Sequence, residues 1–306
     1  MNVFVWHVHG AYMTSLVHGR HRYLVPVLPD RGPDGRGRAQ TYQWPENAVE
    51  VTPEQARTAA IDIMVLQRPI ELESLAEEWT GRRAGVDVPA VYLEHNAPQG
   101  RIAEMRHPVG DRDDVPVVHV THFNQLMWDC GRAPTRVIEH GVVDPGHRYG
   151  GDLPRAAAVI NEPVRRGRVV GADLLPDLNE AAPIDLFGIG TPNDLEQARL
   201  HDEMARRRVY VHPYRWTSLG LSLLEAMHLG MPVVALATTE VVSAVPASAG
   251  VVSNRIDELK DAIRWLVRDR RAAREMGTAG RACAKNRYGL ARFLRDWDSL
   301  FAEVAA

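Results

Sequence analysis

Short, nearly continuous hydrophobic runs alternate along this chain with longer stretches in which apolar residues recur at helical spacing. In the first half, we expect strands at 3–6, 23–28, 61–66, 90–93, 115–120 and 137–138. Such runs, which do not alternate polar with apolar residues, are typical of strands covered on both faces in parallel sheets. Residues 71–80 carry the helical pattern, and Gly81 follows as a stop signal. The pattern predicts βαβ units.

The second half repeats the alternation. Strands are expected at 156–160, 184–187, 209–212, 232–236 and 250–252, and helices at 171–180, 195–206, 219–229, 256–268, 271–286 and 290–305. Residues 29–47 read as a long loop followed by an edge segment, and residues 144–154, rich in Gly and Pro, as an interdomain linker. We therefore expect two doubly wound α/β domains, 1–149 and 150–289. Ligands of such sheets bind at the carboxyl ends of the strands, so the cleft between the domains is the expected site.

Composition narrows the class of protein. The 306 residues include 36 basic and 39 acidic side chains, so the net charge of −3 argues against a nucleic-acid partner. Two cysteines, Cys130 and Cys283, suit a reducing compartment. The first residues carry no basic region of a signal peptide, and no apolar run is long enough to span a membrane. The expected location is the cytoplasm, with peripheral contact to a membrane left open.

The most informative segment is 209–235, which reads as strand, loop, helix and strand. Thr217 and Ser218 can cap the helix, and Gly220 would let a ligand approach its backbone. The amide groups and partial positive charge of a helix start favour a phosphate. Glu225, seven to eight residues further on, could then accept hydrogen bonds from a ribose diol. The alternative is that Glu225 is an ordinary solvated helix residue.

This segment resembles the signature of the retaining glycosyltransferases of family 4 (glycosyl transferases group 1), which have the GT-B fold of two Rossmann-like domains. The residues in register with that signature are Gly220, Leu221, Leu224, Glu225, Ala226, Met227, Gly230, Pro232, Val233, Val234 and Ala235. The family's two glutamates fall on Thr217 and Glu225. The resemblance implies that Glu225 holds the ribose, and that the loop Ser218, Leu219 and Gly220 approaches the diphosphate. Because Thr217 replaces the glutamate that contacts the donor sugar, the identity of that sugar stays open.

Further residues carry the resemblance along the chain. Residues 159–167 align without gaps with the family's Val-Gly-Arg-x-x-x-Glu-Lys-Gly, which implies that Asn161 and Arg166 take the places of an arginine and a lysine that clamp the diphosphate. A solvated basic turn of Arg165, Arg166 and Arg168 is the alternative. Thr239-Glu240-Val241-Val242 resembles a Pro-Glu-Val-Val near the donor, which implies that Glu240 lines the donor site.

In the first half, Glu94-His95-Asn96 resembles the strand end whose histidine faces the donor sugar, and Gly10 lies in the place of a glycine-rich loop near the phosphates. A structural histidine is the alternative for His95. The resemblance also implies that the last helix, within 290–306, packs back on the first domain. The tail residues Trp297, Leu300 and Phe301 fit that packing. No metal ion is expected, because His7, His9 and His18 have no carboxylate or cysteine to complete a ligand set.

These observations predict a retaining glycosyltransferase in which Arg166 stabilises the leaving diphosphate and His95 acts at the sugar. The donor is a nucleotide sugar, with a UDP-sugar favoured over a GDP-sugar, and no separate cofactor is expected. The acceptor can be a glycan, a lipid or a small molecule. Two alternatives remain at this stage: a sugar-nucleotide epimerase of the same fold, and a non-catalytic homologue that binds a nucleotide sugar or a partner.

Overall fold

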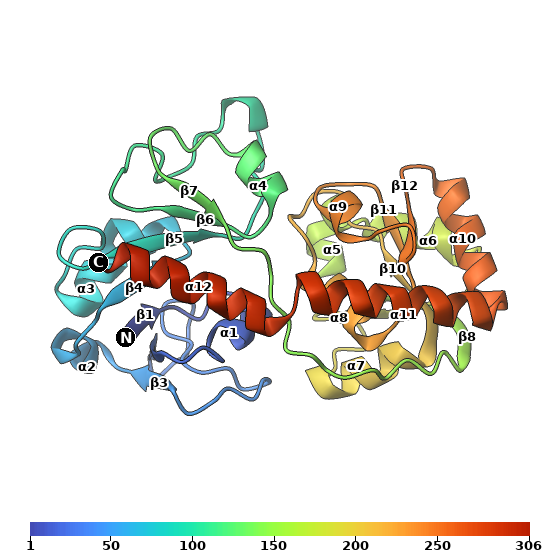
Figure 1. Cartoon of the computed structure of the whole chain (residues 1–306), viewed down its shortest axis with the longest axis horizontal. Helices are drawn as coiled ribbons and strands as arrows, with labels where there is room; N and C mark the ends of the chain where they lie inside the picture. The colour runs from blue at the N-terminus through green and yellow to red at the C-terminus, as the bar shows by residue number, and fades with distance from the viewer. The chain divides into compact units, whose positions relative to one another are not determined.

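A computed structural model describes all 306 residues, and the chain divides into two compact units. The first unit consists of Met1–Gly141 and Leu290–Ala306, and the second of Val142–Gly289. Figure 1 shows that the red helix at the C-terminus lies with the first unit, whose strands are otherwise drawn in blue to green. None of the helices combines the length and the apolar composition that crossing a membrane requires.

The first unit contains a parallel sheet of seven strands in the order β3-β2-β1-β4-β5-β6-β7. The strands are β1 (Asn2–Val5), β2 (Arg22–Pro26), β3 (Ala48–Val51), β4 (Ile63–Leu66), β5 (Ala90–Glu94), β6 (Val117–His119) and β7 (Thr135–Val137). All six predicted strands of this half are confirmed, and the edge segment after the long loop is β3. The helical elements are α1 (Gly10–Leu16), α2 (Pro53–Thr58), the π-helical turn η1 (Glu71–Leu75), α3 (Ala76–Thr80), the 3₁₀ turn η2 (Ile102–Glu104), α4 (His122–Met127) and α12 (Leu290–Val304).

The last helix, α12, is part of the core of the first unit. Its Trp297 is buried, and the indole Nε1–H donates to the hydroxyl of Tyr12 on α1 at 3.1 Å. Phe293 lies edge-on to the same tyrosine ring, with 5.3 Å between the ring centroids. A Cβ at Gly141 would come within 2.3 Å of the Phe293 Cβ, so only glycine allows this close approach. The predicted tail residues Trp297, Leu300 and Phe301 are all buried.

The second unit contains a parallel sheet of five strands in the order β12-β11-β10-β8-β9. The strands are β8 (Leu153–Val159), β9 (Ile184–Phe187), β10 (Arg207–His212), β11 (Val233–Leu236) and β12 (Gly250–Ser253), which confirms all five predictions. The longer helices are α7 (Gln197–Arg206), α8 (Leu221–Leu229), α10 (Ile256–Arg268) and α11 (Arg270–Arg287). The shorter elements are α5 (Pro163–Arg166), η3 (Gly167–Val170), η4 (Ala172–Leu174), α6 (Leu175–Asn179) and α9 (Val241–Ala244).

The predicted linker, residues 144–154, lies inside the second unit. The backbone N–H groups of Arg148 and Tyr149 both donate to the carbonyl of Leu229, each at 3.1 Å, and β8 already begins at Leu153. The division between the units therefore falls between Gly141 and Val142, rather than at the predicted 149/150. Because these backbone groups pair within the second unit, this Gly- and Pro-rich segment is irregular backbone packed on that unit rather than a free linker.

Candidate functional site

The topology of the second sheet singles out one position for a ligand. In sequence order, its strands run 2-1-3-4-5, so the direction of the crossovers reverses between β8 and β10. Ligands of open parallel sheets bind in the crevice at such a switch point, beyond the carboxyl ends of the strands. Tyr214 follows β10, and its hydroxyl donates to the carbonyl of Val159 at the end of β8 (2.9 Å). This bond ties together the two strand ends that flank the switch point.

Arg166 lies at this switch point, at the end of α5. Its guanidinium carbon is 5.9 Å from the centroid of the Tyr214 ring, a cation–π arrangement. The Tyr214 ring in turn stacks on His212, the last residue of β10, with 4.3 Å between centroids and 9° between planes. Arg166 has no carboxylate partner, whereas Arg165 pairs with Glu162 and Arg168 with Asp173. Of the three arginines in this turn, the charge of Arg166 alone is left for an anion.

The start of α8 meets the same cluster through His212. A Cβ at Gly220 would lie 2.6 Å from Cε1 of the His212 ring, so the backbone of Gly220 rests directly on the imidazole. Gly220 is the N-cap residue of α8 and offers no side chain to the helix. The prediction that Thr217 or Ser218 caps this helix is therefore wrong. The contact with His212 fixes the helix start three or two residues later, at a position that only glycine can occupy.

Glu225 lies in the second turn of α8 and is buried. Its Oε1 accepts a hydrogen bond from the Gln197 side-chain amide at 3.1 Å, and its Oε2 lies 3.5 Å from Nε2 of His201. Both partners belong to α7. This burial excludes the alternative that Glu225 is an ordinary solvated helix residue, and its carboxylate keeps further lone pairs for a ligand.

The other residues of the second unit that were predicted to bind the nucleotide sugar lie near the start of α8. The backbone N–H of Glu240 contacts the carbonyl of Ser218 at 3.5 Å, and Ser218 and Leu219 are buried. The Glu240 carboxylate is also buried and pairs with Arg287 of α11 at 3.3 Å. Thr217 is half-buried. The structure thus brings the 217–220 loop and Glu240 side by side.

Asn161 has a structural partner. Its side-chain oxygen accepts the backbone N–H of Ile189 at 2.9 Å, which holds the loop after β9. The side chain is exposed, so the amide NH₂ is the group that remains for a ligand.

In the first unit, the predicted residues also lie at carboxyl ends of strands. The sheet order reverses between β1 and β4, and His95 follows the next strand, β5. The His95 ring packs on His9, with 4.1 Å between centroids, and Gly10 begins α1 directly after His9. Burial is the main cause that lowers the pKa of His95 well below its usual value. His95 is therefore a neutral imidazole at neutral pH.

Three residues of the site in the second unit were not predicted from the sequence: His212, Tyr214 and Gln197. His212 ends β10 and Tyr214 lies two residues beyond it, so the rule that selected His95 could have found these two. Gln197 carries no such signal, because its contact with Glu225 depends on how α7 and α8 pack.

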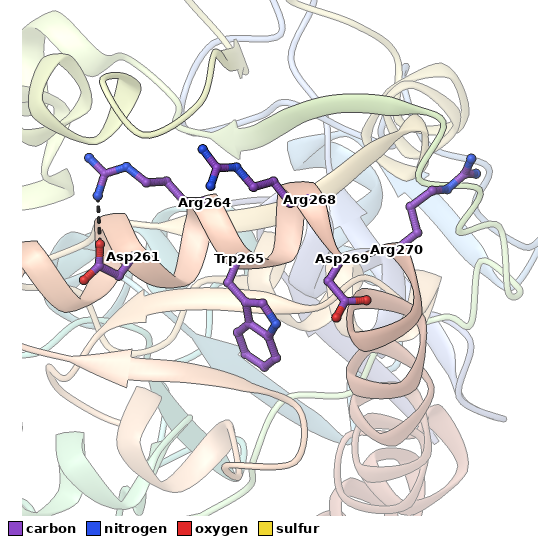
Figure 2. A pocket seen from close by; sticks show the side chains of 6 residues that line it. All are labelled: Asp261, Arg264, Trp265, Arg268, Asp269 and Arg270. Atoms are coloured by element: carbon purple, nitrogen blue, oxygen red, sulfur yellow. Dashed lines mark hydrogen bonds and ion pairs between the residues drawn. The ribbon is translucent and has the colours of Figure 1, made fainter.

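A surface hollow lies elsewhere, at the junction of α10 and α11 (Figure 2). Its lining residues are Asp261, Arg264, Trp265, Arg268, Asp269 and Arg270. Figure 2 shows Arg264 paired with Asp261, while Trp265 points to the other side of the helix. None of the predicted site residues lines this hollow. The candidate site is therefore defined by strand ends and side-chain contacts.

Comparison with known proteins agrees with this architecture. Residues 191–282 match the family model described as glycosyl transferases group 1. No curated protein sequence matches the chain. Among solved structures, the chain is similar to sucrose-phosphate synthase from Thermosynechococcus elongatus, with a TM-score of 0.71, 12% identity and coverage of 99% of this chain and 98% of that chain. It is also similar to Anabaena HepE, solved in complex with UDP-glucose (TM-score 0.68, 15% identity, 99% and 100% covered). A glycosyltransferase from Rickettsia africae gives a TM-score of 0.65 at 13% identity, with 99% and 98% covered.

Two parallel-sheet units of this likeness have the GT-B fold, which confirms the predicted fold class. The stretch that matches the model of glycosyl transferases group 1 contains Thr217, Glu225 and Glu240, so the resemblance found in the sequence is confirmed at the level of this group.

Proposed function

We propose that this protein is a glycosyltransferase that moves a sugar from a nucleoside-diphosphate sugar to an acceptor hydroxyl, with retention of anomeric configuration and without a metal ion. The observation that carries the proposal is the contact series from Arg166 through Tyr214 and His212 to Gly220. This series of contacts links Arg166, which has no carboxylate partner, to the start of α8. Both lie at the switch point of the second unit's sheet. This combination suits a diphosphate.

In the proposed reaction, the bond between the anomeric carbon and the β-phosphate oxygen breaks, and negative charge builds on the leaving diphosphate. Arg166 and the backbone amides around 218–220 stabilise that charge, as preorganised donors do at developing anions. The acceptor oxygen bonds to the anomeric carbon, and its proton passes to an oxygen of the leaving phosphate. This route needs no enzymic carboxylate as nucleophile, which fits the threonine at 217.

The nucleoside and sugar contacts follow from the remaining residues. Glu225 accepts hydrogen bonds from the ribose diol, while Glu240 and Asn161 line the donor site of the second unit and His95, in the first unit, acts at the sugar. Support for UDP as the nucleotide comes from Anabaena HepE, which was solved with UDP and with UDP-glucose. The acceptor can be a glycan, a lipid or a small molecule, with peripheral membrane contact in the lipid case. The two cysteines suit a reaction in the cytoplasm.

Nucleotide binding is the first test. Purified protein is melted in the presence of UDP, GDP and TDP, and UDP at about 100 times its Kd should add about 2.7 kcal/mol of stability. Arg166→Ala should weaken UDP binding by about tenfold or more, since a charge-assisted bond contributes about 1.5–3 kcal/mol. Arg165→Ala is the matched control, because that arginine already pairs with Glu162. Equal losses in both variants would contradict a specific role for Arg166.

Turnover is the second test, and it separates the alternatives. A screen of donors and acceptors, with NMR of the anomeric proton of the product, should reveal transfer with retention. Turnover of a nucleotide sugar without an acceptor would instead indicate an epimerase. Binding without hydrolysis or transfer would indicate a non-catalytic homologue, for which Thr217 and the backbone-bonded Asn161 would be the marks.

A further inference from the structure

Two side chains of one helix meet the carboxylate of Glu225. Gln197 is the first residue of α7 and His201 lies four residues further on, so the two share a face of that helix. The side-chain amide of Gln197 donates to Oε1 of Glu225 at 3.1 Å, and Nε2 of His201 lies 3.5 Å from Oε2. Each oxygen of the carboxylate therefore has its own partner on α7.

The chemistry of the carboxylate decides what each partner presents to it. An ionised carboxylate only accepts hydrogen bonds, so the Gln197 atom beside Oε1 is the NH₂ group, whichever way the amide atoms are named. Nε2 of His201 faces Oε2 with its N–H, because two lone pairs at this distance would repel each other. That nitrogen is buried and has no other acceptor, so Oε2 is the protein group that can satisfy it.

Glu225 differs in its partners from Glu240, the other buried glutamate of the second unit. Glu240 pairs with the guanidinium of Arg287 at 3.3 Å, whereas the ion-pair partner of Glu225 is the imidazole of His201. A guanidinium would occupy several lone pairs of a carboxylate at once. With one N–H donor on each oxygen, each oxygen of Glu225 keeps a lone pair for a ligand.

We propose that His201, together with Gln197, is a positioning residue that holds the Glu225 carboxylate in one orientation, so that each oxygen accepts one hydroxyl of a vicinal diol. That this diol is the ribose of the donor nucleotide rests on the proposed function. The last torsion of a glutamate is broad and is only weakly restrained by its own chain. The two N–H groups of α7 therefore fix the plane of the carboxylate.

Two other buried side chains feel the charge of Glu225 but bond elsewhere. The hydroxyl of Tyr210 donates to Oγ of Ser222 at 2.9 Å. Nδ1 of His228 lies 2.8 Å from the carbonyl of Leu224, so this ring donates to the backbone of its own helix. The orientation of the carboxylate thus depends on α7.

Packing holds the partners of Glu225 in place. His201 is 4% exposed, and Met204, three residues further along α7, is fully buried in the core of the second unit. The carboxylate is therefore oriented when the unit folds, and a nucleotide does not need to order it on binding. Such preorganisation favours affinity for a ligand that matches the preset acceptors.

The first test measures the affinities of the whole chain for UDP, 2′-deoxy-UDP and 3′-deoxy-UDP by calorimetric titration. The unaltered protein should bind UDP about tenfold tighter than either analogue, the weight of a hydrogen bond to a charged acceptor. His201→Phe keeps a buried ring but removes the N–H, so at least one ratio should fall by about fivefold. His201→Gln returns an N–H close to the place of Nε2 and should restore that ratio. His147→Phe, at an exposed histidine of the same unit, is the matched control.

Two outcomes would overturn the positioning role. One is that both ratios survive in His201→Phe, and the other is that His201→Gln loses as much as His201→Phe, which would indicate packing rather than a donated bond. Gln197→Met removes the second N–H at a half-buried position, so it keeps the proposal testable if His201→Phe does not fold. It should also lower a ratio by about fivefold, and unchanged ratios would count against the proposal.

A double-mutant cycle gives an answer that does not depend on the nucleotide. His201→Phe and Glu225→Ala, alone and combined, should be coupled by about fivefold in the equilibrium constant for urea unfolding, because each removes the same contact. Additive effects would overturn the contact on which the proposal depends. If no nucleotide binds, or if UDP and its analogues bind alike, the proposed function fails at the ribose, while the cycle still decides whether His201 holds Glu225.

Discussion

The ring of Tyr214 lies flat on the imidazole of His212, at 4.3 Å and 9°, and burial lowers the pKa of His212 to about 3. In the unfolded chain, the pKa of a histidine is about 6.5. The unfolded state therefore takes up a proton that the folded state refuses. The stability due to this difference is fully present above pH 6.5 and is lost as the pH falls through the window from 6.5 to about 3.

His212→Phe should make the protein less sensitive to acid. Phenylalanine can keep the stack on Tyr214 but takes up no proton. Between pH 7 and pH 5, the variant should therefore lose about 2 kcal/mol less free energy of unfolding than the unaltered protein. Urea unfolding at both pH values, monitored by circular dichroism, measures it. An equal loss of stability in the variant and the unaltered protein would exclude His212 as a source of the acid sensitivity.

Two glycines of α11 should respond oppositely to the same substitution. A Cβ at Gly277 would lie 1.9 Å from the carbonyl oxygen of Gly230, the C-cap residue of α8, whereas at Gly280 the nearest atom is 3.4 Å away. Gly277→Ala should cost about 1–3 kcal/mol or more, because backbone must move. Gly280→Ala should be neutral or gain up to about 1 kcal/mol from helix propensity. Thermal melts compare them, and equal melting temperatures would refute the close packing of α8 on α11.

Two tryptophans offer a similar contrast. Trp297 of α12 is 1% exposed and Trp265 of α10 is 45% exposed. Trp297→Ala should destabilise the protein by about 3–5 kcal/mol, since it opens a cavity next to Tyr12. Trp265→Ala should change stability by no more than about 0.5 kcal/mol. Urea midpoints that shift alike in the two variants would show that α12 is not part of the core.

The contacts of Glu225 predict discrimination against deoxynucleotides. If its carboxylate accepts both ribose hydroxyls, UDP should bind about tenfold tighter than 2′-deoxy-UDP, and Glu225→Ala should abolish this ratio. Gln197→Ala should reduce the ratio in part, because Gln197 holds one oxygen of that carboxylate. Glu258→Ala, which removes an exposed carboxylate from α10, is the control for charge. Calorimetric titrations give both affinities, and a ratio that survives Glu225→Ala would remove Glu225 from the ribose site.

The strands could be predicted because each is a run of apolar residues that the sheet buries on both faces, as at Ile63–Leu66 and Val233–Leu236. β3 gave a weaker signal, since Glu50 interrupts it and pairs with Arg31 of the preceding loop. The start of α8 was missed for a different reason. Local propensity favours Thr217 or Ser218 as the cap, but the contact between Gly220 and the ring of His212 at the end of β10 decides where the helix begins.

The candidate site was predictable only as far as single residues carry chemistry. Glu225 and Arg166 stand out by type and position in the sequence. Their partners do not, because Gln197 and Tyr214 act through packing between elements that the chain brings together from 28 and 48 residues away. Gln67, whose amide oxygen is 2.8 Å from Nε2 of His95, likewise reaches that ring only because β4 pairs in parallel with β5.

The return of α12 to the first unit has a consequence for synthesis on the ribosome. The second unit is a single uninterrupted stretch, Val142–Gly289, inserted between the two pieces of the first. Every contact within that inserted stretch is available as soon as Gly289 has emerged. The first unit, although its sheet is translated earliest, must wait for Phe293 and Trp297 before the surface around Tyr12 is covered. The half that is made second is therefore the half that can finish folding first.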